Sequence, residues 1–269
     1  MAKKDMVQDQ NNFMNARRHI LNKNSSFTAQ EAYKSLRTNI RFYLQDKKCR
    51  RISITSPISS EGKSITILNL AISVAEDGQR VLLIDADLRR PTQSRLLVEK
   101  PSPGLSNVLA GLCSPAEAIR ENVYPNLDVI LSGDIPPNPS ELLGSDRMKE
   151  LIDTMSEKYD YILVDAPPIN VVSDASIVTS LLDGVLLLVR HGQTRKDAVK
   201  RAVARLKLTG IKPLGFVLND VDMHSGKGGY GYGYGYGYGY GYGYGYGYSY
   251  GSNYNLDNGM QNDNVFKKR

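Results

Sequence analysis

The sequence has few cysteines and no long apolar run, and these absences exclude several classes of protein. Its 269 residues include only Cys49 and Cys113, whose spacing fits no metal site and which are expected to be free thiols in a reducing compartment. No run approaches the roughly 18 unbroken apolar residues of a membrane span. Residues 1–20 are polar and lack the apolar stretch of a secretory signal. With 41% hydrophobic residues, we expect one large α/β domain or two small ones.

The positive charge is concentrated at the start of the chain. Residues 1–51 hold 12 Lys and Arg against 4 Asp and Glu, a net +8, whereas the remainder holds 22 against 24, a net −2. A solvated basic arm explains this excess, and so does attraction to an anionic membrane surface, worth about 1 kcal/mol per basic residue. Nucleic acid is not an expected partner, because no aromatic residues are interleaved with the basic ones.

The stretch "SPISSEGKSI" ends like a phosphate-binding loop but lacks the glycine that opens one, since Pro57 stands in its place. Gly62 leaves room for a phosphate, Lys63 can reach the β- and γ-phosphates, and the Ser64 hydroxyl can bind Mg²⁺. A strand is predicted before the loop, and a long apolar helix, closed by Gly78, after it. This context predicts an ATP site formed by Ser59, Ser60, Glu61, Gly62, Lys63, Ser64 and Ile65.

Strands and helices are predicted to alternate after this loop. The strands are "RISITS", "RVLLIDAD", "NLDVILSG", "YDYILVDAPP", "GVLLLVR" and "PLGFVLND". Near-continuous apolar strands with helical crossovers indicate a P-loop NTPase-like α/β fold, with a mostly parallel sheet covered by helices on both faces. Ser56, Asp85, Asp87 and Asp165 follow strands at the edge where such sheets bind ligands. The aspartates could simply cap loops; beside a phosphate loop we favour a magnesium site of Ser64, Asp87 and Asp165.

Three segments are expected along the chain. Residues 1–27 have no sustained periodicity and are expected to form a flexible basic arm. Residues 28–223 are expected to form the P-loop domain, beginning with a helix that runs to about residue 46. Thr28 and Glu31 have the spacing of a capping box at its start. Residues 224–269 are expected to be a disordered tail.

Glycine and tyrosine alternate from Gly229 to Gly251, broken only by Ser249. No aliphatic residue in this run could help to bury a core, which favours disorder. The run is typical of an adhesive low-complexity segment, but an extended chain is also what a phosphate acceptor requires. Beside a nucleotide site we favour acceptors, namely Tyr230, Tyr232, Tyr234, Tyr236, Tyr238, Tyr240, Tyr242, Tyr244, Tyr246, Tyr248, Tyr250 and Tyr254.

Together these motifs resemble the bacterial tyrosine kinases of capsule and exopolysaccharide biosynthesis, in their separate Gram-positive form. "SPISSEGKS" resembles the family's Walker A motif, "VLLIDADLRRP" its A′ motif and "YDYILVDAPP" its Walker B motif. "GDIPPNPSELL" is a further family stretch. The helix "EAYKSLRTNI" resembles the oligomerisation motif, with Glu31, Lys34 and Arg37 at its three positions. Lys34 replaces an arginine and cannot make the same bidentate contact. Ser60 stands where the family often has glycine.

The resemblance implies a protein-tyrosine kinase that uses ATP and Mg²⁺ and phosphorylates the tail tyrosines of a neighbouring subunit in a ring. Lys63, Asp85 and Asp87 would be catalytic, with Asp85 orienting or deprotonating the tyrosine hydroxyl. It further implies activation by the cytoplasmic tail of a membrane protein of the polysaccharide co-polymerase type, which would recruit this cytoplasmic chain to the inner face of the membrane, and reversal by a protein-tyrosine phosphatase. The kinase would thereby regulate polysaccharide polymerisation and export.

Three other functions share part of this pattern. A septum-positioning or DNA-partitioning ATPase switch shares the fold, but such proteins typically carry a second lysine early in the loop. No Lys or Arg lies between Ile52 and Gly62 here. An iron–sulfur carrier would need paired cysteines. A purely adhesive protein would leave the acidic strand ends without a purpose.

Overall fold

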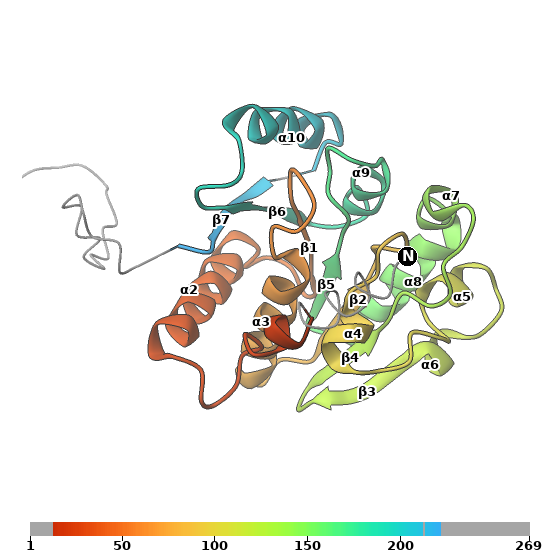
Figure 1. Ribbon diagram of the computed structural model, residues 1–269. Coiled ribbons are helices and arrows are strands. Elements are labelled where there is room, and N and C mark those ends of the chain that lie inside the picture. Colours follow the sequence, from red (N-terminus) through yellow and green to blue (C-terminus); the bar gives the residue numbers. More distant parts are fainter. Residues whose placement is uncertain (1–12, 212, 222–269) are drawn as a thin grey trace, which may run out of the picture. The chain divides into compact units, whose positions relative to one another are not determined.

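The computed structural model describes residues 13–211 and 213–221 (Figure 1). The basic start of the arm and every predicted acceptor tyrosine therefore lie outside the described residues. Within them, no helix is long and apolar enough to cross a membrane. The strands are β1 Arg50–Thr55, β2 Val81–Asp85, β3 Ile119–Tyr124, β4 Leu127–Ile130, β5 Tyr161–Asp165, β6 Gly184–Arg190 and β7 Pro213–Asn219. The helices are α2 Phe27–Tyr43, α3 Lys63–Glu76, α4 Gln93–Leu97, α5 Leu105–Leu109, α6 Pro115–Ala118, α7 Pro139–Leu143, α8 Asp146–Ser156, α9 Asp174–Thr179 and α10 Lys196–Leu208.

These strands form one sheet in the order β3-β4-β2-β5-β1-β6-β7. Every neighbouring pair is parallel except β3 with β4, so the predicted mostly parallel sheet is confirmed. The parallel pairing brings the ends of β1, β2, β5, β6 and β7 to one edge. The loop expected to bind phosphate, the acidic strand ends and the end of β7 therefore lie at the same edge of the sheet.

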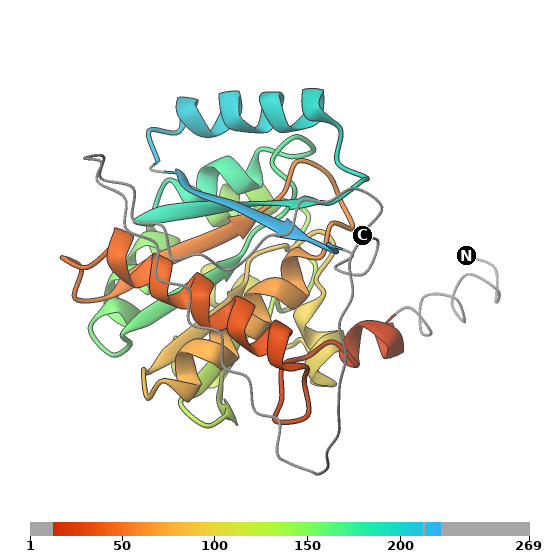
Figure 2. The ribbon, with the colours of Figure 1, turned by 90° about the vertical axis from the view of Figure 1, so that its left-hand side faces the viewer.

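The two faces of the sheet are buried by different helices (Figure 2). Successive strand residues point to opposite faces, and accordingly Tyr161 and Leu163 of β5 belong to one apolar cluster, with Ile52 and Ile54, while Ile162 and Val164 belong to the other. The first cluster includes most of α3, and α2 packs outside it. The second includes residues of α8, α9 and α10. Burial on both faces explains why these strands read as continuous apolar runs.

β3 was not predicted from the sequence. Its residues, "IRENVY", are mostly polar and only partly buried, and it pairs antiparallel with β4 at the edge of the sheet. An edge strand is hydrogen-bonded to a neighbouring strand on one side only and does not have to be apolar on both faces. Its sequence therefore shows little of the apolar run that identifies a central strand.

The start of the domain differs from the sequence prediction at two points. The N-cap of α2 is Ser26, whose hydroxyl accepts a hydrogen bond from the Ala29 amide at 3.3 Å, and not Thr28. Glu31 does not reach back to the Thr28 amide but pairs with Lys34. Residues 13–27 are also not all a free arm, because Leu21 is buried and its amide donates to Asn69 Oδ1 at 2.8 Å.

Asp183, directly before β6, ties this strand to β1. Its carboxylate accepts hydrogen bonds from the Arg51 amide at 3.0 Å and from Arg51 Nε at 3.1 Å, and Lys47 Nζ lies 3.1 Å away. Burial alone would raise the pKa of Asp183, but the bonds from Arg51 outweigh it and hold the pKa below its ordinary value. Because the pKa of Asp183 is lower in the folded state than in the unfolded state, its carboxylate stabilises the fold at pH values above the unfolded-state pKa. This contribution is lost as the pH falls through the folded-state pKa.

We predict that Asp183→Asn lowers the free energy of unfolding by about 2–3 kcal/mol at pH 7, less than for a fully buried pair because Arg51 is partly exposed. The difference from the wild type should shrink below pH 4. Urea denaturation across pH measures both. Asp153→Asn is the matched control, because exposed Asp153 meets the same arginine at 3.2 Å and should cost under about 1 kcal/mol. Equal losses in the two variants would contradict the prediction.

Candidate nucleotide site

The loop between β1 and α3 has the backbone of an anion-binding site. Gly62 precedes α3 with φ +98°, and no side chain caps the helix. Among the described residues, the amides of Ser59 to Ile65 find no hydrogen-bond acceptor. A helix N-terminus with a row of free amides favours negative charge. The predicted ATP residues thus form one cradle that fits a phosphate group.

Lys63 begins α3 and is largely buried, with 8% of its surface exposed. Its charge lowers the pKa values of Asp87 and Asp165, although burial keeps both values raised overall. Lys63 therefore lies close enough to both carboxylates to interact with them electrostatically.

Asp165, at the end of β5, is held by a residue that the sequence analysis missed. The fully buried Gln93 Nε2 donates to Asp165 Oδ2 at 2.9 Å and to the Ser64 carbonyl at 3.0 Å. The other carboxylate oxygen of Asp165 is buried without a hydrogen-bond partner among the described residues. Gln93 follows the A′ motif, but no local pattern indicated that its side chain turns inward.

Asp85 has a different environment from the one expected. It is fully buried, and its carboxylate accepts amide hydrogen bonds from Asp87 at 3.2 Å, Thr92 at 3.3 Å and Gln93 at 3.1 Å. Burial, with the nearby charge of Asp165, raises its pKa well above the ordinary value. These contacts fix the loop after β2 and argue against Asp85 as the group that meets a tyrosine hydroxyl. Asp87 is also largely buried, with 8% of its surface exposed against none for Asp85, and its pKa is raised as well, chiefly by burial.

The residues present fit a magnesium ion held partly by water and phosphate. No group of three or more His, Cys, Asp or Glu among the described residues could hold a metal by itself. Mg²⁺ usually binds one or two protein ligands and keeps several waters. The unpartnered oxygen of Asp165, with Asp87 and the Ser64 hydroxyl close to it, suits that arrangement.

Ser60 is strained. It adopts φ +63°, a left-handed conformation that costs an L-residue roughly 1–2 kcal/mol and that glycine adopts freely. This is a physical reason for the glycine that the family often has here. Ser59, its equally exposed neighbour, is not among the residues with positive φ.

We predict that Ser60→Gly is more stable than Ser59→Gly by about 1–2 kcal/mol, since only the first relieves strain while both add chain entropy. Chemical denaturation of the two variants measures the difference. If both substitutions destabilise the protein equally, the left-handed conformation is not strained in this loop.

The three residues of the predicted oligomerisation motif lie on α2 and are engaged within the chain. Lys34 Nζ pairs with Glu31 at 2.8 Å. Arg37 donates from Nη1 to the Ser73 carbonyl, and its Nη2 lies 3.3 Å from Asp77. The Arg37 guanidinium therefore joins α2 to α3 within the chain.

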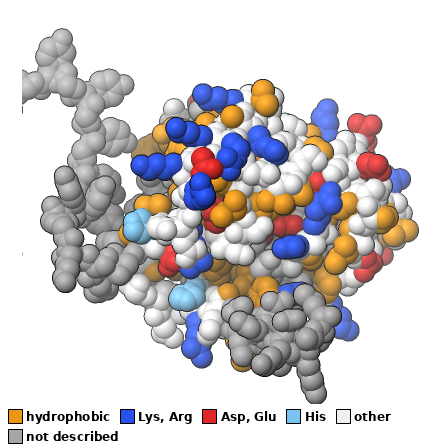
Figure 3. Space-filling view, turned by 45° about the horizontal axis from the view of Figure 1, so that its top comes forward, with side chains coloured by type: hydrophobic (Ala, Val, Ile, Leu, Met, Phe, Trp, Pro, Cys, Tyr) orange, Lys and Arg blue, Asp and Glu red, His pale blue; other side chains and the backbone are white. Residues whose placement is uncertain are grey.

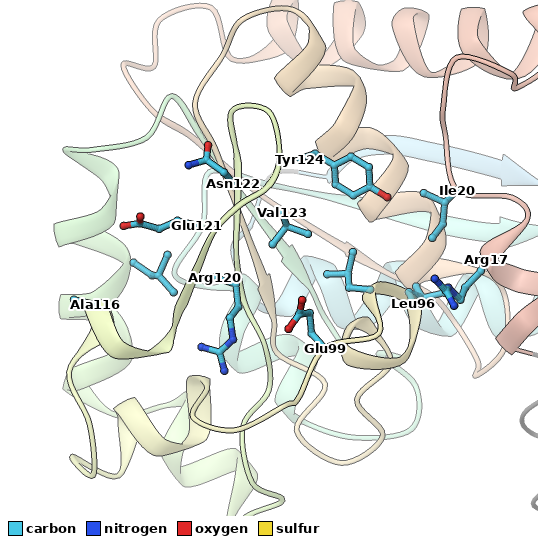
Figure 4. A pocket seen from close by; sticks show the side chains of 12 residues that line it. Arg17, Ile20, Leu96, Glu99, Ala116, Arg120, Glu121, Asn122, Val123 and Tyr124 are labelled. Carbon is cyan, nitrogen blue, oxygen red and sulfur yellow. The ribbon is translucent and has the colours of Figure 1, made fainter.

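Two other surface features lie apart from the nucleotide loop. A cavity of about 660 Å³ is lined by residues including Arg17 and Ile20 of the N-terminal segment and Val123 and Tyr124 of β3, but by none of the predicted site residues (Figure 4). On the side of α10, Lys and Arg side chains gather on the surface (Figure 3). α10 has five basic residues and only Asp197 as an acidic one, so positive charge is not confined to residues 1–51.

Comparison with known proteins agrees with this geometry. Residues 49–207 match a family model described as an AAA domain. The chain is 41% identical over 203 residues to the tyrosine-protein kinase YwqD of Bacillus subtilis, covering 75% of this chain and 86% of the relative. The kinase domain of the Escherichia coli tyrosine kinase ETK superposes with a TM-score of 0.71 at 36% identity, covering 77% and 80%. The cell division ATPase MinD of Pyrococcus furiosus gives 0.54 at 30%, covering 63% and 71%.

Proposed function

Because the chain belongs to the family of bacterial tyrosine-protein kinases, we propose that it transfers the γ-phosphoryl group of ATP to tyrosines of its own C-terminal tail. The observation that carries the proposal is the cradle of amides at Ser59 to Ile65 with Lys63 beside two carboxylates. The same chain supplies twelve candidate acceptor tyrosines, Tyr230 to Tyr250 at every second position and Tyr254.

The reaction assigns a role to each group at the sheet edge. Phosphoryl transfer depends mostly on positioning and charge stabilisation. The loop amides would orient the phosphates, and Lys63 would stabilise charge on the transferred group. Ser64, with Asp87 and Asp165 through water, would hold Mg²⁺, which neutralises charge on the phosphate oxygens when bound. Asp87, which keeps some exposed surface where Asp85 has none and whose pKa is raised, is better placed than Asp85 to receive a hydrogen bond from the tyrosine hydroxyl.

The decisive experiment is to incubate the purified full chain with labelled ATP, with and without the cytoplasmic tails of candidate membrane proteins, and to map the label. Label on the tail tyrosines, increased by one of those tails, supports the proposal. ATP hydrolysis without tyrosine label would instead support an ATPase switch like MinD. The absence of a second basic residue early in the loop argues against that alternative.

The resemblance also supports partners for this kinase. A membrane activator of the polysaccharide co-polymerase type would recruit it to the inner face of the membrane, a ring of copies would allow phosphorylation between neighbours, and a phosphatase would reset the tail. These partners would place tail phosphorylation in control of polysaccharide polymerisation and export.

A subunit interface on α2 remains a prediction. Glu31 and Lys34 are exposed, and an interface would have to recruit Arg37 in addition to its contacts with α3. We predict that replacing Glu31 and Arg37 by alanine shifts the unphosphorylated protein to monomer in sedimentation. Arg41→Ala, on the same helix and with its side chain 69% exposed, is the control and should leave the oligomer intact. Melting curves are needed alongside, because losing Arg37 also weakens packing within the chain. An unchanged oligomer in a folded double mutant would defeat the prediction.

A further inference from the structure

Glu61 is a buried carboxylate inside the phosphate loop, directly before Gly62. Only 2% of its surface is exposed, and it forms no ion pair with a described residue. One carboxylate oxygen accepts a hydrogen bond from the Thr194 hydroxyl, and the other from the Ile58 amide at 3.3 Å. A carboxylate without a cationic partner is costly to bury. Its position therefore calls for an explanation beyond packing.

Thr194 is itself held in place by the turn after β6. Its hydroxyl oxygen accepts a hydrogen bond from the Arg190 amide at 2.7 Å, which directs the hydroxyl proton toward Glu61. The carboxylate is therefore held by a donor whose orientation is already fixed, and not by a mobile surface side chain.

The end of β7 holds the same residue through its main chain. Asn219 Nδ2 donates to the Glu61 carbonyl at 2.8 Å. The side-chain amide of Asn219 also fills the space that a Cβ on Gly62 would need. The turn after β6 and the end of β7, both distant in sequence from the loop, thus fix Glu61 at its side chain and at its backbone, next to the free amides of Ser59 to Ile65.

We propose that Glu61 is the positioning residue of the phosphate loop and that it acts through Thr194 and Asn219. Holding the loop from both sides keeps its amides convergent before a nucleotide arrives, so binding does not have to order them. The consequence is a contribution to nucleotide affinity from Thr194, a residue that the nucleotide itself does not need to contact. This inference concerns binding, so it holds or fails independently of whether the tail tyrosines are the acceptors.

The test measures Mg·ADP affinity of the full chain by calorimetry, which needs no kinase activity. Thr194→Val keeps the shape and removes the hydroxyl, and should weaken Mg·ADP binding about tenfold, equivalent to about 1.4 kcal/mol. Thr194→Ser keeps the hydroxyl and should bind within about twofold of the wild type. In autophosphorylation, the KM for ATP of Thr194→Val should rise while kcat changes little.

Two further variants separate positioning from a merely structural role. Thr209→Val removes a hydroxyl that donates to the Leu206 carbonyl at 2.7 Å, at the far end of α10, and should lower the melting temperature without changing Mg·ADP affinity. Glu61→Gln keeps the shape but leaves one oxygen in place of two, and should weaken binding in the same direction as Thr194→Val. If Thr194→Val and Glu61→Gln, or the latter alone should the former not fold, bind Mg·ADP as the wild type does, the proposal is overturned.

Discussion

Replacing Lys63 by methionine is expected to lower the rate of autophosphorylation by about a thousandfold or more. Removing one preorganised group that stabilises charge in a transition state costs about 10²–10³ in rate, and a cation acting on a transferred phosphoryl group about 10³–10⁵. Lys63 begins α3 beside the free amides and near Asp87 and Asp165. It is the described cation to which the proposed mechanism assigns stabilisation of charge on the transferred phosphoryl group. Labelling with radioactive ATP measures the effect.

The same substitution is expected to leave the protein folded. Methionine has a similar length and fills the buried space, while Asp87 and Asp165, whose pKa values are already raised by burial, lose a neighbouring positive charge. We expect a melting temperature within about 4 °C of the wild type, since 1 kcal/mol corresponds to about 2–4 °C in a domain of this size. Lys200→Met, exposed on α10, is the control. Wild-type labelling by Lys63→Met, with nucleotide purity controlled, would remove Lys63 from the site.

The edge of the sheet that holds the site could be predicted because its signal is local. β2, β5 and β6 are almost entirely apolar and β1 has isoleucine at alternate positions, and polar residues mark the ends of these strands at Ser56, Asp85 and Asp165. Parallel pairing then brings those ends together whatever the order of the strands. The phosphate loop and the acidic strand ends could therefore be placed at one edge of the sheet without any knowledge of their contacts.

The contacts between these elements could not be predicted in the same way. Thr194 lies 133 positions from Glu61 and Asn219 lies 158, and a single polar residue in a loop gives no sign of a partner at that distance. Asn219 had a usable signal, since it ends an apolar strand at the site edge as Asp165 does. Arg37 had none, because the "EAYKSLRTNI" helix does not reveal that one arginine turns toward α3.

The second large effect expected is the loss of oligomer stability as phosphates accumulate on the tail. From Gly226 onward the unmodified side chains carry Lys227, Lys267, Lys268 and Arg269 against Asp257 and Asp263, a net charge of +2. Each phosphotyrosine adds about −1.5 to −2, so six would bring the segment to roughly −7 to −10. β7, which leads toward this segment, ends beside the phosphate loop, as Asn219 shows by its bond to the Glu61 carbonyl.

If copies of the chain form a ring, charge that accumulates on the segment after β7 of each copy should repel its neighbours. We therefore expect the oligomer to dissociate progressively with the number of phosphates, and not at one critical tyrosine. Repulsion between exposed charges is screened by salt, with a Debye length of about 10 Å at 0.1 M and 3 Å at 1 M. High salt should consequently restore part of the assembly at any given degree of phosphorylation.

A series of tails retaining three, six or nine tyrosines, with the others changed to phenylalanine, tests this charge mechanism. Each variant is phosphorylated fully and sized at low and high salt. The matched controls are two tails that each keep six tyrosines of the run between Tyr230 and Tyr250. One keeps the six nearest the start of the run and the other the six nearest its end, so that they share as few tyrosines as possible. Equal dissociation of these two, intermediate between three and nine and weaker at high salt, is the expected result. If one phosphotyrosine dissociates the oligomer whatever the total number, or if salt has no influence, a specific docking contact must replace charge repulsion as the cause.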